Sequence, residues 1–430
     1  MQADLINLSP LAQLAWVGLL FAAPTLGWLA WRQRGQSTAR RLRALTALAL
    51  FLTFDLVLFG AFTRLTDSGL GCPDWPGCYG HASPVGAQVP ISEAQAAMPT
   101  GPVTHGKAWV EMVHRYLASS VGVLLVVLMV WSWLAARRDR SQGITPRWAT
   151  VTFLWVCMQG AFGALTVTMK LYPAIVTLHL LGGIGLLALL AVQAQQHGHA
   201  QTQAGSSVAG WWPNQVALSP ALRRGAWALL LLTVAQVSLG GWVSTNYAVL
   251  ACTEFPTCQG SWWPEMDFAS GYTWLRELGR SADGSYLPFA ALTAIHVTHR
   301  LAAFGVFAAL GLLSWRLWHA GAAARVYARW LIWLGVAQLV TGLSNVVLGW
   351  PLVAAVAHTG GAAALVAVLA ALLASATDRV TGRVARRVSG DVSARTPFPA
   401  EAARSGAPDA SPSTPRRKPS SSASVSLTRP

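Results

Sequence analysis

Residues 108–135 read AWVEMVHRYLASSVGVLLVVLMVWSWLA, and residues 289–316 read FAALTAIHVTHRLAAFGVFAALGLLSWR. As a helix, each stretch is long enough to cross the roughly 30 Å hydrocarbon core of a membrane. Each also carries a histidine in its first half, His114 in the first and His299 in the second. Because an imidazole inside lipid is costly without a partner, the two stretches predict a membrane fold and a buried site together.

The composition is that of a membrane protein. Hydrophobic residues make up 53% of the chain and charged residues 11%, with a mean hydropathy of +0.44, whereas about a quarter of the residues in a soluble protein are charged. We therefore predict an all-α integral membrane protein with nine membrane-spanning helices. The expected spans lie near residues 11–31, 43–64, 108–135, 147–168, 173–193, 222–244, 289–316, 326–348 and 352–375.

The net charge of +15 is distributed over the loops in a way that predicts topology. Arginines gather in alternate connections, such as those at Arg40, Arg137 and Arg223, while the intervening loops hold most acids, such as Asp67 and Glu254. By the positive-inside rule, the N-terminus lies outside a bacterial inner membrane and the C-terminus lies in the cytoplasm. Nucleic-acid binding is the weaker interpretation of the charge, and we expect no nucleic-acid partner.

One pattern of reactive residues occurs twice, about 180 residues apart. It pairs Cys72 with Cys252, Cys78 with Cys258, His114 with His299, and His179 with His358. A repeat with residues in register predicts one unit used twice. Eight of the nine helices form these units, four to each, so the two four-helix-bundle repeats are parallel and follow one extra N-terminal helix.

These units predict four segments of the chain. Residues 1–42 form the extra helix and a cytoplasmic linker, residues 43–200 the first half with an outer loop at 65–107, residues 201–376 the second half with an outer loop at 245–288, and residues 377–430 a disordered cytoplasmic tail. The tail is rich in Ser, Pro, Ala and Arg and lacks the apolar periodicity that a packed fold needs.

The four matched histidines predict metal ligands. His114 and His179 lie at similar depths in the second and fourth helices of the first half, and His299 and His358 repeat this arrangement. Two imidazoles that face each other across a bundle form a bis-His haem site. Zinc or copper is less favoured, because neither pair has further Cys or carboxylate ligands at its depth. A hydrogen-bonded structural histidine is the alternative for each residue alone, but four matched residues favour two b-type haem sites.

The halves differ three residues before the first histidine, where the first has Glu111 and the second has His296. The spacing puts Glu111 on the same helix face as His114, one turn nearer the outside. A carboxylate there can accept protons, whereas an acid that merely favours a helix start is the alternative. Since only one half has the acid, we predict that the two sites do different work.

Three arginines lie near the outer ends of their helices: Arg64, Arg115 and Arg300. A guanidinium suits the carboxylates of haem propionates, so we consider all three as propionate partners. Side chains that only reach toward the membrane surface are an equally favoured interpretation.

Each cysteine pair has five residues between its members and lies on the oxidising side of the membrane. This spacing favours the disulfides Cys72–Cys78 and Cys252–Cys258. A redox-active first pair that relays electrons is the alternative.

The segment GAFTRLTDSGL at residues 60–70, the segment EMVHR at residues 111–115 and the later histidines together resemble the haem A synthase family over residues 43–376. The resemblance implies an oxidoreductase that acts on a CH group. It oxidises the C8 methyl of haem O to a formyl group by successive hydroxylations, giving haem A for terminal oxidases. The extra first helix and the long tail depart from the family pattern.

The resemblance also implies roles for residues. The first half receives the substrate haem O at His114 and His179, with Glu111 as the catalytic residue, and the second half holds a permanent haem b at His299 and His358. A haem O synthase, an electron acceptor and a second copy of the chain are candidate partners beside membrane lipid. Because an iron with two histidine ligands has no open position for O2, electron removal with water as the oxygen source is our hypothesis.

Two other functions share the four histidines. A non-catalytic di-haem b cytochrome could pass electrons between quinone and a periplasmic partner, and a transporter of haem would also fit parallel repeats. Neither gives a reason for an acid at Glu111 in one half only. The asymmetry therefore favours the enzyme.

Overall fold

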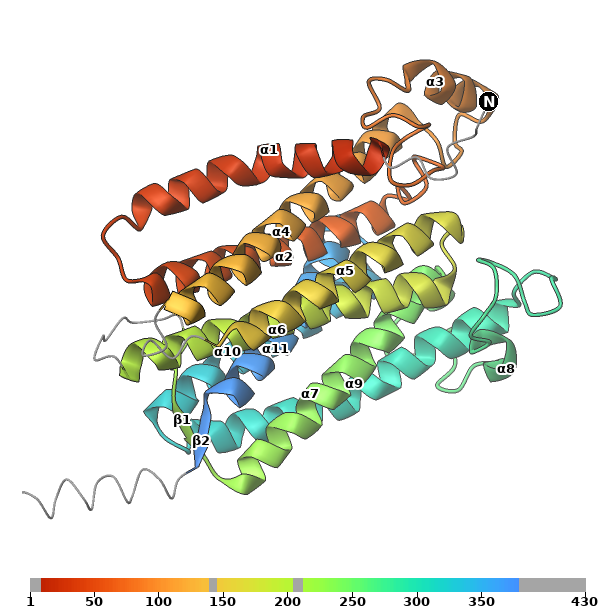
Figure 1. The fold of residues 1–430 in the computed structure, drawn as a ribbon. Coiled ribbons are helices and arrows are strands. Elements are labelled where there is room, and N and C mark those ends of the chain that lie inside the picture. Colours follow the sequence, from red (N-terminus) through yellow and green to blue (C-terminus); the bar gives the residue numbers. More distant parts are fainter. Residues whose placement is uncertain (1–8, 139–144, 204–211, 379–430) are drawn as a thin grey trace, which may run out of the picture. The chain divides into compact units, whose positions relative to one another are not determined.

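The computed structural model describes residues 9–138, 145–203 and 212–378 of the chain, which are mostly helical with almost no sheet (Figure 1). Within these residues nine helices are long and apolar enough to cross a membrane, and each overlaps one predicted span, which confirms the prediction. These helices are α1 Ser9–Arg32, α2 Thr38–Leu65, α4 His105–Arg138, α5 Pro146–Thr168, α6 Pro173–Gln203, α7 Pro220–Thr245, α9 Phe289–Trp318, α10 Ala322–Val347 and α11 Leu352–Ser375.

The remaining elements are short. They are α3 Gln88–Ala97, the 3-10 helix η2 Ala248–Ala251, α8 Phe268–Gly271, and the strands β1 Val216–Leu218 and β2 Ala376–Asp378. The two strands pair in parallel, with Val216 opposite Ala376. The sequence did not predict this pairing, and it includes the first two residues of the expected tail. The rest of that tail, residues 379–430, lies outside the described residues.

The eight helices that follow α1 form two four-helix bundles. In the first, α2, α4, α5 and α6 contact one another in a ring, and in the second α7, α9, α10 and α11 do so in the same cyclic order. The first and fourth helices of each bundle form the junction, where α2 contacts α11 and α6 contacts both α7 and α11. Helix α1 packs against α4, outside the ring. The symmetry axis that the sequence suggested stays a prediction.

Small residues bring the helices close together. A Cβ added at Gly18 in α1 would lie 2.8 Å from the Cβ of Ser119 in α4, and one at Gly360 in α11 would lie 2.4 Å from a methyl of Leu58 in α2. Glycine at such positions lets backbones approach, which is how bundles in lipid pack without a hydrophobic driving force.

The two long loops lie at one end of the helices. In Figure 1, α3 of the first loop and α8 of the second lie at the same end of the bundles, opposite the β1–β2 pair. Each loop has a small core of its own. Cys72 and Ile91 of the first loop are fully buried with Met112 of α4, and Cys252 of the second loop packs with Val297 of α9. Each loop is therefore packed against the helix that follows it.

Candidate functional site

Each of the four matched histidines packs against a glycine of a neighbouring helix. An added Cβ would lie 3.1 Å from His114 Nε2 at Gly60, 3.5 Å from His179 Cε1 at Gly163, 3.0 Å from His299 Cε1 at Gly240, and 3.2 Å from His358 Cε1 at Gly342. Larger residues would press on three of the four rings, so the glycines make room for the imidazoles. In sequence position, Gly60 of the first half matches Gly240 of the second, and Gly163 matches Gly342.

The imidazoles come together in pairs. His114 and His179 lie close enough to interact electrostatically, and so do His299 and His358. All four side chains are half-buried. The structure thus brings together the predicted ligands of each half.

The donor set fits a haem better than a bare metal ion. Across residues 9–138, 145–203 and 212–378, no three His, Cys, Asp or Glu side chains gather as a metal site. A haem needs only two protein ligands, because its macrocycle supplies four nitrogens to the iron. In addition, Nδ1 of His179 is buried and has no hydrogen-bond partner among the described residues. An unpartnered ring nitrogen of this kind leaves the imidazole free to turn toward a ligand.

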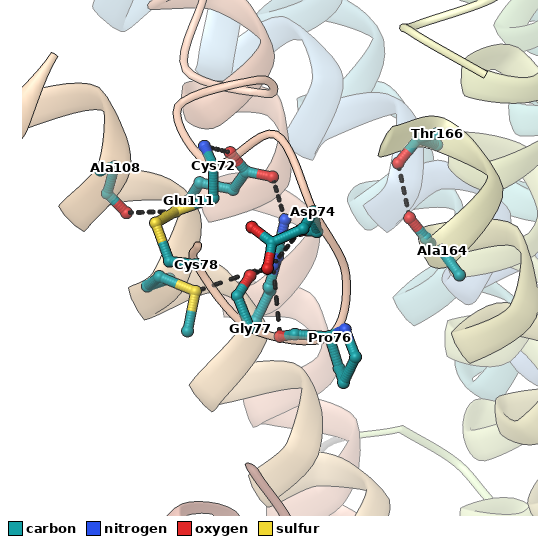
Figure 2. A network of polar contacts seen from close by, with 12 residues as sticks. Cys72, Asp74, Pro76, Gly77, Cys78, Ala108, Glu111, Ala164 and Thr166 are labelled. Carbon is teal, nitrogen blue, oxygen red and sulfur yellow. Dashed lines mark hydrogen bonds and ion pairs between the residues drawn. A yellow bond between two sulfur atoms is a disulfide. The ribbon is translucent and has the colours of Figure 1, made fainter. Parts of the chain in front are cut away.

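Glu111 lies one turn before His114 on α4, and both its carboxylate oxygens are engaged (Figure 2). Its Oε1 accepts a hydrogen bond from Arg115 Nη2 at 2.5 Å, and its Oε2 accepts one from the backbone N–H of Cys72 at 2.8 Å. Glu111 therefore connects α4 to the loop that carries the first disulfide. The ion pair was not predicted from the sequence, although an acid four residues before a base is a spacing typical of helical pairs.

Arg115 and Arg300 hold the two loops through backbone carbonyls. Arg115 Nη1 donates to the carbonyl oxygens of Asp74 at 3.0 Å and Gly77 at 2.5 Å. Arg300 donates to those of Cys252 at 2.9 Å and Thr257 at 3.1 Å. Each arginine was predicted as a propionate partner, and that role stays a prediction. What the structure adds is a fork that fastens each loop to its histidine-bearing helix.

Arg64, the third predicted propionate partner, reaches into the other half. Its Nη2 donates to the carbonyl oxygen of Ser244 at 2.7 Å, and its guanidinium lies 4.2 Å from the ring centroid of Tyr247. Its Nη1 also pairs with Asp67 Oδ1 at 3.2 Å. Arg64 thus links the outer ends of α2 and α7.

Both predicted disulfides are formed in the structure, with S–S distances of 2.08 Å for Cys72–Cys78 and 1.99 Å for Cys252–Cys258. All four sulfur-bearing residues are buried. Each disulfide closes a loop whose backbone also pairs at one isolated bridge, Cys78 with His81 and Cys258 with Ser261.

An acid completes each of these loops. The carboxylate of Asp74 accepts from the backbone N–H of Gly80 at 2.7 Å, and that of Glu254 accepts from Gly260 at 2.5 Å. The hydrogen bond from Gly260, followed by one from Thr257, holds the pKa of the exposed Glu254 below its ordinary value.

The second half replaces the acid of the first with an uncharged ring. His296 is buried, and Arg300 Nε donates to its Nε2 at 3.2 Å. The pair of Glu111 with Arg115 therefore has a counterpart at His296 with Arg300, but only the first pair contains a carboxylate. This difference between a carboxylate and an imidazole lies three residues before His114 in one half and before His299 in the other.

Two further polar residues contact the rings and were missed from the sequence. Gln236 of α7 contacts His299, and Thr341 of α10 contacts His358. The available signal was a polar side chain inside an apolar span, which calls for a partner.

The chain is similar to proteins that take part in haem biosynthesis. A family model described as cytochrome oxidase assembly protein, COX15-CtaA, matches residues 16–370. A haem A synthase of Shewanella oneidensis is 37% identical over 322 residues, which cover 75% of this chain and 92% of that protein. A haem A synthase of Symbiobacterium thermophilum is 30% identical over 55% of this chain and 71% of its own length. A haem A synthase of Methylobacterium nodulans is 27% identical over 71% of this chain and 84% of its own length.

Proposed function

Because the chain belongs to the COX15-CtaA family of cytochrome oxidase assembly proteins, we propose that it is a haem A synthase. The reaction converts the C8 methyl of haem O to a formyl group. With water as the oxygen source, one methyl group and one water give one formyl group, four protons and four electrons. The protein must therefore take up protons at the methyl and pass electrons to an acceptor, which is a redox partner outside this chain.

The first half is proposed to bind the substrate haem O. His114 and His179 would supply the axial ligands, and Glu111 would accept the protons that leave the methyl carbon. One observation carries this assignment: the first half has the carboxylate of Glu111 at the position where the second half has the uncharged ring of His296. An acid beside only one of two similar sites supports chemistry there and electron handling at the other.

The second half is proposed to hold haem b between His299 and His358. A haem b bound there supplies a one-electron redox centre. Arg300 holds the Cys252–Cys258 loop over the outer end of this site. We place the protein in a bacterial inner membrane with both disulfide loops outside, as the distribution of arginines indicates.

The test replaces the carboxylate without removing its hydrogen-bonding capacity. Glu111→Gln keeps an oxygen that can accept from the Cys72 N–H, whereas Glu111→Ala would also leave Arg115 buried without its partner. We expect purified Glu111→Gln protein to retain haem but to form haem A at least ~100-fold more slowly, the usual scale for loss of a general base. Limited proteolysis of the loop at residues 65–107 checks that the loop is still in place.

The matched control is Glu93→Gln, which removes an exposed carboxylate from α3 in the same half. It should convert haem O at the wild-type rate. Unchanged conversion in Glu111→Gln would contradict the role of Glu111. A wild-type protein whose extracted pigments contain haem B alone, and which never converts haem O, would instead be a di-haem electron carrier.

A further inference from the structure

The two halves surround their histidine rings with different side chains. In the second half, hydrogen-bonding groups from neighbouring helices reach Nδ1 of both imidazoles. In the first half, no hydrogen bond to either imidazole is found among the described residues, and Nδ1 of His179 is buried without a partner. The nitrogen that a ligand histidine does not use for its metal normally has a partner, which sets the tautomer and the orientation of the ring.

Thr341 orients the ring of His358. Its hydroxyl donates to the carbonyl oxygen of Ala337 at 2.7 Å, and its oxygen lies 3.0 Å from His358 Nδ1. Since the hydroxyl proton is already donated, the oxygen accepts the proton of Nδ1. This tautomer leaves Nε2 of His358 unprotonated, which is the state that binds iron. The backbone of the same histidine is also held, because Gln338 Nε2 donates to its carbonyl oxygen at 2.9 Å.

Gln236 contacts both the ring and the backbone of His299. Its Nε2 lies 3.1 Å from Nδ1 and 3.5 Å from Nε2 of the ring, and it donates to the carbonyl oxygen of His299 at 3.0 Å. Its own Oε1 is buried and has no partner among the described residues. The amide nitrogen is the donor in these contacts, so Gln236 limits the rotation of the His299 ring and holds its backbone without accepting a ring proton.

The equivalent positions of the first half are apolar. Counting back by the same offsets that match Gly240 with Gly60 and Gly342 with Gly163, Gln236 corresponds to Leu56 and Thr341 to Phe162. His114 instead lies parallel to the ring of Phe59, at a centroid distance of 6.3 Å. A ring contact of this kind sets no tautomer and gives His114 no directional bond.

We infer that Gln236 and Thr341 are positioning residues that make the second half retain its haem, and that Leu56 and Phe162 make the first half able to release one. This inference rests on the proposed function, in which one site binds a permanent cofactor and the other a substrate that must enter and leave. The halves thus differ at two positions beside their histidine rings, in addition to the difference between Glu111 and His296. Partners of ligand histidines typically change metal affinity 10–100-fold.

The experiment measures haem loss rather than activity. Full-length protein purified with its haems is mixed with excess apomyoglobin, and transfer is followed by absorbance. In wild-type protein we expect a fast phase from the first half and a slow phase from the second. Thr341→Val and Gln236→Leu should speed the slow phase at least ~10-fold and leave the fast phase unchanged. Thr341→Ser, which keeps the hydroxyl, should restore the slow phase.

The reciprocal variants Leu56→Gln and Phe162→Thr should slow the fast phase and leave the slow phase unchanged. Ser344→Ala on α10 and Ser238→Ala on α7 are matched controls, because each removes a hydroxyl that bonds only within its own helix. A slow phase that keeps its wild-type rate in both Thr341→Val and Gln236→Leu would overturn the inference. A wild-type protein that forms no haem A would contradict the proposed function and leave the comparison of the two phases intact.

Discussion

Asp67 and Tyr247 occupy matching positions in the two halves, 180 residues apart, and bond directly to each other: the Tyr247 hydroxyl donates to Asp67 Oδ1. Arg64 and Ser244, which are 180 residues apart as well, also meet, with the Arg64 guanidinium donating to the Ser244 carbonyl. Two matching residues can touch only where the halves adjoin. The outer ends of α2 and α7 therefore form a polar clasp between the halves, defined by Arg64, Asp67, Ser244 and Tyr247.

Tyr247→Phe should weaken this clasp. The variant loses the hydrogen bond to Asp67 but keeps the aromatic ring beneath Arg64. We expect the free energy of unfolding to fall by about 1 kcal/mol, because the half-exposed Asp67 makes this bond weaker than a buried one. Thermal unfolding of the detergent-solubilised protein measures it. Tyr286→Phe is the control, since Tyr286 is 79% exposed. Equal melting temperatures for the two variants would show that the clasp contributes no stability.

Arg115→Ala should release the first outer loop. The side chain is 7% exposed, and its removal leaves a buried carboxylate at Glu111 and several unpaired carbonyls. Breaking one partner of a buried ion pair costs about 3 kcal/mol or more. We expect rapid proteolysis within residues 65–107 and a lower melting temperature. Arg138→Ala, at the other end of α4, should leave the loop protected; if Arg115→Ala protein is equally protected, the arginine does not hold the loop.

Local patterns predicted most of this molecule. The nine spans follow from apolar runs of about 20 residues, and both disulfides follow from cysteines six positions apart. The sequence shows that the glycines match between the halves, but not that they contact the histidines. Which faces of two helices meet depends on tertiary packing and is not encoded by local sequence. The forks of Arg115 and Arg300 depend on the path of loops some 40 residues away, and the β1–β2 pair joins residues 160 positions apart. No local pattern contains such contacts.

The second outer loop should loosen in acid. Backbone and side-chain donors from Gly260 and Thr257 hold the pKa of Glu254 below its ordinary value. A carboxyl whose pKa is lower in the folded loop contributes stability above the ordinary pKa and loses it as the pH falls through the folded value. We therefore expect proteolysis of residues 245–288 with an acid-active protease to rise as the pH drops below about 4.3. Glu254→Gln should remove this pH dependence, and an unaltered profile in that variant would assign it to another group.

Gly60→Val and Gly240→Val should each abolish haem binding in one half only. The first carbon of the new side chain would lie 3.1 Å from His114 Nε2 in one case and 3.0 Å from His299 Cε1 in the other, so a branched residue must displace the ring. We expect Gly60→Val protein to keep haem b and lose bound haem O, and Gly240→Val protein to lose haem b, as identified by pigment extraction. Gly122→Val on α4 is the control, because an added Cβ there meets nothing within 4 Å. Full pigment content in both variants would mean that these glycines do not make room for the ligands, and the assignment of the histidine pairs to haem would lose its main steric support.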